Sequence, residues 1–211
     1  MGSWELYLIY GVGFLSQGLF AARLIIQWFL SEKAGRIVSP AIFWQLSVVA
    51  SYLFIIYGFL QNDFVIILGQ SMAYIIYIRN LQLEGCWTTM PMSFRLGAVV
   101  LPVVTILWMF LPAANMEMSM DSGSFLHPLF LIGAIGQMLL NFRFLYQWYY
   151  AEKMKTSLLP IGFWIMTSIG SILVVIYAWE KFDPVLLGAQ GLGLIASLRN
   201  LQLHYKTREA S

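Results

Sequence analysis

Two arginines lie inside apolar stretches of the chain, each among polar residues of the same types. Arg23 and Gln27 are four residues apart and share one face of a helix, while Gln17 and Trp28 share a neighbouring face. Arginine presents a planar fork of N–H donors that matches the oxygens of phosphate or carboxylate. Because a polar side chain inside a membrane helix is costly, such a group needs a structural or functional reason. The group is therefore a candidate anion-binding site.

The same residues recur 120 positions further along the chain. Residues 11–83 align without a gap with residues 131–203, and the pentapeptide Arg-Asn-Leu-Gln-Leu at 79–83 recurs unchanged at 199–203. This self-similarity indicates a duplicated unit. If the polar faces point inward, both copies line one central space. The predicted substrate-binding residues are Arg23, Arg143, Gln27, Gln147, Gln17, Gln137, Gln70, Gln190, Trp28 and Trp148.

Purely structural explanations of these residues are also open. Arg23 is about two turns from the end of its predicted helix, so its side chain could reach the lipid headgroups. The glutamines could hydrogen-bond neighbouring helices. Trp44 and its copy Trp164 lie at helix starts, where an aromatic belt at the membrane interface is the default interpretation.

The composition excludes most other classes of protein. Of the 211 residues, 60% are hydrophobic and only 10% are charged, whereas a soluble domain carries about 25% charged residues. The net charge of +2 is too small to indicate a nucleic-acid partner, and the single cysteine, Cys86, excludes an intramolecular disulfide and a multi-cysteine metal site. We expect an integral membrane protein without nucleic acid, metal or cofactor.

Seven apolar stretches are long enough to predict an all-α protein with seven transmembrane helices. They are Glu5–Leu30, Pro40–Leu60, Phe64–Leu83, Leu96–Pro112, Phe125–Tyr150, Pro160–Trp179 and Pro184–Leu203. A unit of three crossings ends on the opposite side of the membrane, so a second copy fused directly to it would be inverted. The fourth helix crosses once more and gives both copies the same orientation. The result is a 3+1+3 arrangement of two parallel three-helix repeats. The predicted domains are residues 5–84, a linker with the fourth helix at 85–124, residues 125–204, and a cytoplasmic tail at 205–211.

The basic residues predict the orientation in the membrane. One side would carry Lys33, Arg36, Arg79, Arg95, Lys153, Lys155, Arg199, Lys206 and Arg208, and the other only Lys181. This places the N-terminus outside and the C-terminus in the cytoplasm.

Signals for catalysis are weak. His127 and His204 are not repeated, and no nucleophile motif or phosphate-cradling loop with a lysine is visible. An enzyme is therefore the less favoured interpretation, and an enzyme of lipid modification stays open as a third alternative. Gly188, Gly191 and Gly193 in the last apolar stretch predict close helix packing.

The joint pattern of the first repeat resembles the lipid A biosynthesis N-terminal domain family, small bacterial membrane units found alone or fused ahead of lipid-A-disaccharide synthase. The pattern is Gln17-x5-Arg23-x3-Gln27-Trp28-x2-Ser31-Glu32-Lys33, Ser39-Pro40-x2-Phe43-Trp44, Gly69-Gln70 and Ile76-Tyr77-Ile78-Arg79-Asn80-Leu81. The second copy departs from it at Ala151, Leu159 and Ala189. The family is similar to PQ-loop and SWEET-type transporters, although the literal Pro-Gln pair is missing.

The resemblance implies a role in the biosynthesis of lipid A, and so of lipopolysaccharide, at the bacterial inner membrane. We expect a transporter or carrier that binds a lipid-linked saccharide or a lipid A-related phosphoglycolipid, with membrane lipids and lipid A biosynthetic enzymes as further partners. One alternative is a membrane anchor or scaffold for an enzyme such as lipid-A-disaccharide synthase, and another is a small-sugar transporter. The synthase chemistry belongs to the fused soluble domain, and we expect none of it from these residues.

Overall fold

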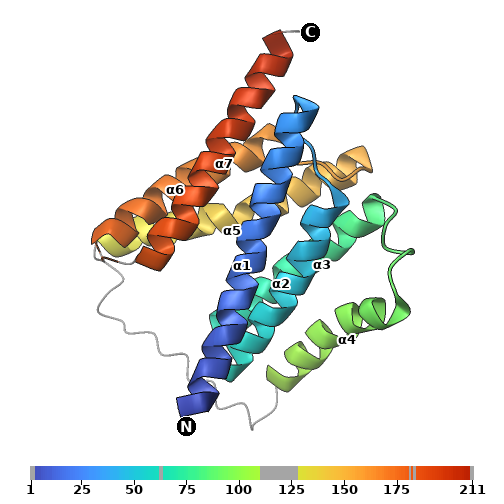
Figure 1. Cartoon of the computed structure of the whole chain (residues 1–211), viewed down its shortest axis with the longest axis vertical. Helices are drawn as coiled ribbons and strands as arrows, with labels where there is room; N and C mark the ends of the chain where they lie inside the picture. The colour runs from blue at the N-terminus through green and yellow to red at the C-terminus, as the bar shows by residue number, and fades with distance from the viewer. Residues whose placement is uncertain (1–2, 62–63, 110–127, 181, 183, 210–211) are drawn as a thin grey trace. The chain divides into compact units, whose positions relative to one another are not determined.

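The computed structural model describes residues 3–61, 64–109, 128–180, 182 and 184–209. Within these residues the regular structure is entirely helical, which confirms the predicted all-helical chain. The helices are α1 (Ser3–Ala34), α2 (Ala41–Leu60), α3 (Phe64–Leu83), α4 (Met92–Met109), α5 (Pro128–Met154), α6 (Ile161–Glu180) and α7 (Pro184–Glu209), as Figure 1 shows. The predicted end of the fourth stretch at Pro112 and start of the fifth at Phe125 lie outside the described residues, as does the outer part of the 85–124 linker.

Three helices of the described part are long and apolar enough to cross a membrane. They are the segment Tyr7–Ala34 of α1, α2 and α6, judged by length and composition. A helix of about 20 apolar residues spans the hydrocarbon core of a bilayer. The chain thus has the character of a membrane-associated protein, while seven crossings and a 3+1+3 arrangement stay predictions.

The ends of α1 and α5 repeat the same backbone geometry. Gly35 follows α1 with a φ of 65°, and its N–H donates to the carbonyl of Glu32 at 3.2 Å. The equivalent position after α5 is Lys155, which adopts a φ of 52°. Glycine enters this left-handed region freely, whereas a residue with a Cβ is disfavoured there. The turn therefore recurs in the second copy although its glycine does not.

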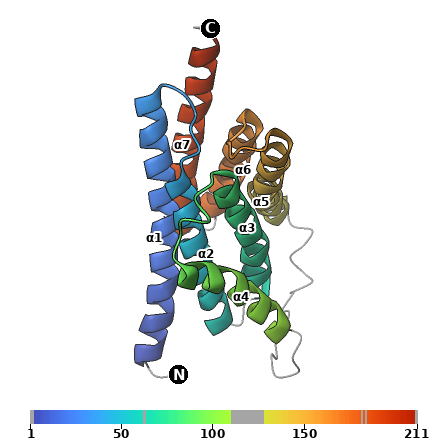
Figure 2. The ribbon, with the colours of Figure 1, turned by 90° about the vertical axis from the view of Figure 1, so that its right-hand side faces the viewer.

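The chain divides into two compact units, of which the first is Met1–Arg23 with Ala41–Ser119. Within it α2 and α3 lie side by side, as Figures 1 and 2 both show, and α4 contacts both of them. The first part of α1 packs against α2, where Ser16 Oγ donates to the carbonyl of Ala50 at 2.8 Å. The ring of Phe20 meets that of Phe54 edge to face. These contacts position Arg23, the last residue of α1 in this unit.

The second unit is Leu24–Pro40 with Met120–Ser211. Here α6 packs against both α5 and α7, and the segment that follows α1 joins them through a hydrogen bond between the hydroxyls of Ser39 and Ser157 at 3.0 Å. The packing units therefore differ from the duplicated sequence segments, because residues 24–40 of the first repeat pack with the helices of the second.

Close helix packing uses other glycines than those predicted. A Cβ on Gly188 or Gly191 would meet nothing within 4 Å, so the prediction for these two is wrong; they face open space on α7. A Cβ on Gly193 would lie 3.4 Å from Ser171 Oγ, which is an ordinary van der Waals contact. The close approach is between α5 and α6, where a Cβ on Gly170 would lie 2.9 Å from the carbonyl oxygen of Gly136.

The tryptophans at the starts of α2 and α6 belong to the protein interior. Trp44 and Trp164 are both 0% exposed, and each meets the preceding phenylalanine edge to face, at 4.8 and 5.1 Å between ring centroids. The aromatic-belt interpretation is therefore wrong for these positions, because their rings are covered by neighbouring helices and not by lipid headgroups.

Candidate functional site

The guanidinium of Arg23 is held by one hydroxyl and three aromatic rings. The side chain is 5% exposed, and its Nη1 donates to Ser47 Oγ on α2 at 2.6 Å. Its Cζ lies 4.6 Å from the ring centroid of Phe20, 5.0 Å from that of Phe43 and 5.3 Å from that of Tyr77. Ring faces attract cations at such distances. We call these five residues the first arginine centre; its burial excludes the snorkelling explanation of Arg23.

Arg143 occupies an equivalent setting in the second unit. Its Nη1 donates to Thr167 Oγ1 on α6 at 3.0 Å, and its Cζ lies 5.0 and 5.2 Å from the ring centroids of Phe144 and Phe163. Thr167 donates in turn to the carbonyl of Phe163 at 2.6 Å, as Ser47 does to that of Phe43. We call Arg143, Thr167, Phe144 and Phe163 the second arginine centre. The duplication therefore preserves an oriented guanidinium, and not only its sequence.

Gln27 links the last part of α1 to the connection that follows it and to α7. It is 0% exposed, and its Nε2 donates to Ser31 Oγ at 2.9 Å, to the carbonyl of Val38 at 3.1 Å and to Asn200 Oδ1 at 3.0 Å. Asn200 Nδ2 donates back to Gln27 Oε1 at 3.3 Å. Its copy Gln147 is equally buried and donates to the carbonyl of Leu158 at 2.9 Å. Both glutamines therefore hold the connection that follows their own helix.

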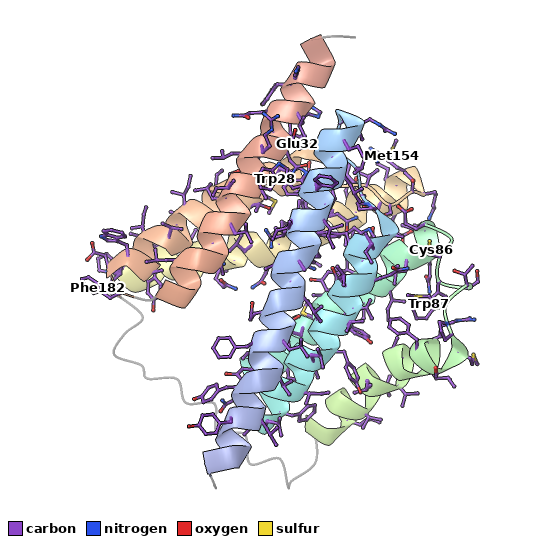
Figure 3. The ribbon with its side chains drawn as sticks, in the orientation of Figure 1. Trp28, Glu32, Cys86, Trp87, Met154 and Phe182 are labelled. Carbon is purple, nitrogen blue, oxygen red and sulfur yellow. The ribbon has the colours of Figure 1, made fainter. Side chains whose placement is uncertain are left out.

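Trp28 lies beside an ion pair that the sequence did not single out. Its Nε1 donates to Glu32 Oε1 at 2.9 Å, one turn away near the end of α1 (Figure 3). Arg199 of α7 forms a bidentate ion pair with the same carboxylate: its Nη2 donates to Oε2 at 2.9 Å and its Nε donates to Oε1. Trp148 repeats the first contact with Glu152 at 3.4 Å. The signal that could have identified this pair is that Glu32 and Arg199 both belong to duplicated motifs.

The remaining predicted residues fall into two kinds. Gln70 Oε1 accepts a hydrogen bond from Ser51 Oγ at 2.8 Å, and Gln190 Oε1 accepts one from Ser171 Oγ at 3.1 Å. Gln17 and Gln137 are exposed, and the described contacts of the arginine centres do not include them. The structure thus brings a hydroxyl and aromatic rings to each arginine, while a role of these glutamines in binding stays a prediction.

The chain matches the lipid A biosynthesis N-terminal domain family twice, over residues 12–82 and again over residues 132–202. The two matches start 120 residues apart (12 and 132), which is the offset of the repeated contacts. Each arginine centre has its arginine and its hydroxyl partner within one of these matches. No solved structure matches the chain.

Similar proteins are considerably longer than this chain. It is 34% identical over 214 residues to a lipid-A-disaccharide synthase of Chlamydia pneumoniae, with 97% of this chain and 35% of that protein covered. It is 33% identical over 217 residues to a lipid-A-disaccharide synthase of Chlamydia muridarum, with 96% and 35% covered. The chain therefore spans about a third of the length of these relatives. With both repeats matched, the chain belongs to the lipid A biosynthesis N-terminal domain family.

Proposed function

We propose that the chain is a carrier-type membrane unit of lipid A biosynthesis that binds a lipid A-related phosphoglycolipid through at least one of its two arginine centres. The observation that carries this proposal is the duplicated guanidinium, held among apolar helices by a hydroxyl and ring faces. Membership of the family supports the pathway. A lipid-linked saccharide is the wider ligand class to which such a molecule belongs.

The geometry favours a phosphate ligand. Ser47 and Thr167 each take one N–H of the arginine fork, which fixes the plane of the guanidinium before any ligand arrives. A fixed donor loses less conformational entropy on binding, and charge-assisted hydrogen bonds between arginine and phosphate are stronger than neutral ones. The surrounding rings also keep the site poor in water, which strengthens the electrostatic attraction.

The proposal includes movement of the ligand between the two faces of the inner membrane. Duplicated parallel repeats are the architecture of SWEET-type transporters, in which one repeat rocks against the other. The twofold family match supports the duplication on which this part of the proposal rests.

Equilibrium binding tests the ligand class. The full chain in lipid nanodiscs is titrated with lipid A, and Arg23→Gln with Arg143→Gln is compared with wild type. We expect the double variant to bind about tenfold or more weakly, because charge-assisted hydrogen bonds are lost. Arg36→Gln, an exposed arginine between α1 and α2, is the matched control and should bind as wild type does. Unchanged affinity in the double variant would refute the proposal.

The relatives favour a second candidate, a membrane anchor for a lipid A biosynthetic enzyme. They are named as synthases, and this chain covers only 35% of their length. An anchor binds its enzyme and needs no ligand at the arginines. Purified lipid-A-disaccharide synthase is therefore mixed with nanodiscs that hold the chain. A stable complex combined with no lipid A binding would favour this candidate over the carrier.

Cys86 tests the proposed orientation, in which the N-terminus is outside and the C-terminus cytoplasmic. This free, half-buried thiol lies between α3 and α4, in a connection predicted to face the cytoplasm. In intact spheroplasts we expect a membrane-impermeant maleimide to leave it unlabelled and to label it after permeabilisation. Cys86→Ser is the background control. Labelling before permeabilisation would contradict the orientation.

A further inference from the structure

The two arginine centres differ in what covers the guanidinium. In the first, Phe20 and Tyr77 close over Arg23, and the side chain is only 5% exposed. The positions equivalent to these rings in the second copy are Leu140 and Ser197. Arg143 is accordingly half-buried. The first guanidinium is enclosed by aromatic rings, whereas the second is more accessible.

The second copy also holds two additional buried hydroxyls on the helices α6 and α7. Ser168 replaces the Val48 of the first copy, and Ser197 replaces Tyr77. Their Oγ atoms lie 2.8 Å apart, between α6 and α7. Ser168 follows Thr167, the hydroxyl that holds Arg143. We call Thr167, Ser168 and Ser197 the hydroxyl cluster. The first repeat has an apolar and an aromatic side chain at two of these three places.

A buried donor of α6 supplies an independent observation. Trp164 is 0% exposed, and its Nε1 has no hydrogen-bond partner within the part of the chain that the structure describes. Positions 164, 167 and 168 share one helix face. The Trp164 ring meets that of Phe163 at 5.1 Å, and Phe163 in turn lies under Arg143. A buried donor without a partner is costly and is an exception that calls for an explanation, such as a ligand.

We propose that the second centre is the one that binds ligand, and that it recognises a phosphorylated sugar head group. Arg143 binds the phosphate. The hydroxyl cluster and Trp164 Nε1 form hydrogen bonds with the oxygens of the adjoining sugar. The first centre is structural, because its rings take the place that a ligand would need. This inference rests on the proposed function and deepens it by assigning the site to one repeat and adding the sugar.

Single variants of the full chain in nanodiscs separate the two centres. We expect Arg143→Gln to weaken binding of lipid A about tenfold or more, as the loss of a charge-assisted contact does. Arg23→Gln should lower the thermal unfolding midpoint and weaken binding several-fold less than Arg143→Gln. If Arg23→Gln does not fold, Arg23→Lys, which keeps the cation, replaces it. If the Arg23 variant loses as much affinity for lipid A as the Arg143 variant, the assignment of the site to one repeat is wrong.

The hydroxyl cluster is tested by Ser168→Ala with Ser197→Ala. Removing both partners of a hydrogen bond costs little stability, so this variant should fold. We expect about threefold to tenfold weaker binding of lipid A. Phosphatidylglycerol, a phosphate lipid without a sugar, should compete poorly with lipid A on wild type and relatively better on this variant. The matched control, Ser16→Ala with Ser71→Ala, also removes two buried hydroxyls and should bind as wild type does.

The outcomes distinguish this inference from the proposed function. If affinity is unchanged in the cluster variant, or phosphatidylglycerol competes equally well on wild type, the sugar assignment is wrong. If lipid A does not bind the wild-type chain, or binds the double arginine variant unchanged, both the proposed function and this inference fail. If the double arginine variant loses binding but the losses of the two single variants are equal, the proposed function stands and this inference fails.

Discussion

At the residue scale, Arg23 and Gln27 of α1 bind side chains far away in the sequence, Ser47 on α2 and Asn200 on α7. Arg23 stands out because a cation in an apolar helix is rare. Ser47 and Thr167 do not stand out, because small hydroxyl residues are common in membrane helices. Asn200 lies 173 residues from Gln27, and only the fold brings the two together. The sequence therefore predicts which polar residues are important, whereas their contact partners are known only from the structure.

The Gln27–Asn200 pair gives a prediction at this scale. Gln27→Leu alone removes the donor to Asn200 Oδ1, and Asn200→Leu alone removes the donor to Gln27 Oε1. Each variant leaves a buried amide oxygen without that donor, and we expect each to cost about 1–3 kcal/mol of stability. The double variant should lose less than the sum of the two, because neither amide is then left unsatisfied. Thermal unfolding in detergent measures all three variants. Additive losses would show that the two amides are not coupled.

At the element scale, the helices follow closely from the apolar stretches, but the helix faces do not. The predicted Pro40–Leu60 and Phe64–Leu83 agree within a residue with α2 and α3. The prediction of close packing is wrong for Gly188 and Gly191 of α7, because sequence alone does not show which face of an apolar helix meets a neighbour. Gly170 does meet one, and the backbone of Gly136 lies opposite it.

A pair of glycine variants tests this packing. Gly170→Ala puts a methyl group 2.9 Å from the Gly136 carbonyl oxygen, so α5 and α6 must separate. We expect a loss of about 1–3 kcal/mol and a lower unfolding midpoint. Gly191→Ala is the matched control on α7, where a Cβ meets nothing within 4 Å. Because alanine favours a helix, that variant should be as stable as wild type or slightly more. The reverse order of stabilities would contradict the α5–α6 contact.

At the scale of the whole molecule, the duplication was evident from sequence, and the division into packing units was not. Residues 24–40 belong to the first repeat but pack in the unit that contains α5, α6 and α7. Hydrogen bonds join residues 24–40 to the rest of this unit: Gln27 with Asn200, Glu32 with Arg199, and Ser39 with Ser157. An offset alignment finds equivalent residues, but it gives no information on contacts between the copies.

An engineered disulfide tests whether the first repeat reaches the second in this way. Since the Ser39 and Ser157 hydroxyls lie 3.0 Å apart, Ser39→Cys with Ser157→Cys should form a disulfide under mild oxidation. Cys86→Ser removes the native thiol from this background. Intact mass and resistance to alkylation report the bond, and each single-cysteine variant is a control. Two cysteines that stay reduced and alkylate freely would contradict the contact of residues 24–40 with the connection between α5 and α6.

The carrier proposal is tested most directly by the identity of the lipid that co-purifies with the full chain. Mass spectrometry of lipids extracted from the purified protein would be compared between wild type and Arg23→Gln with Arg143→Gln. We expect a phosphorylated glycolipid of the lipid A type on wild type, depleted on the double variant while bilayer phospholipids stay equal. The same phospholipids on both proteins, with no phosphorylated glycolipid on wild type, would contradict it.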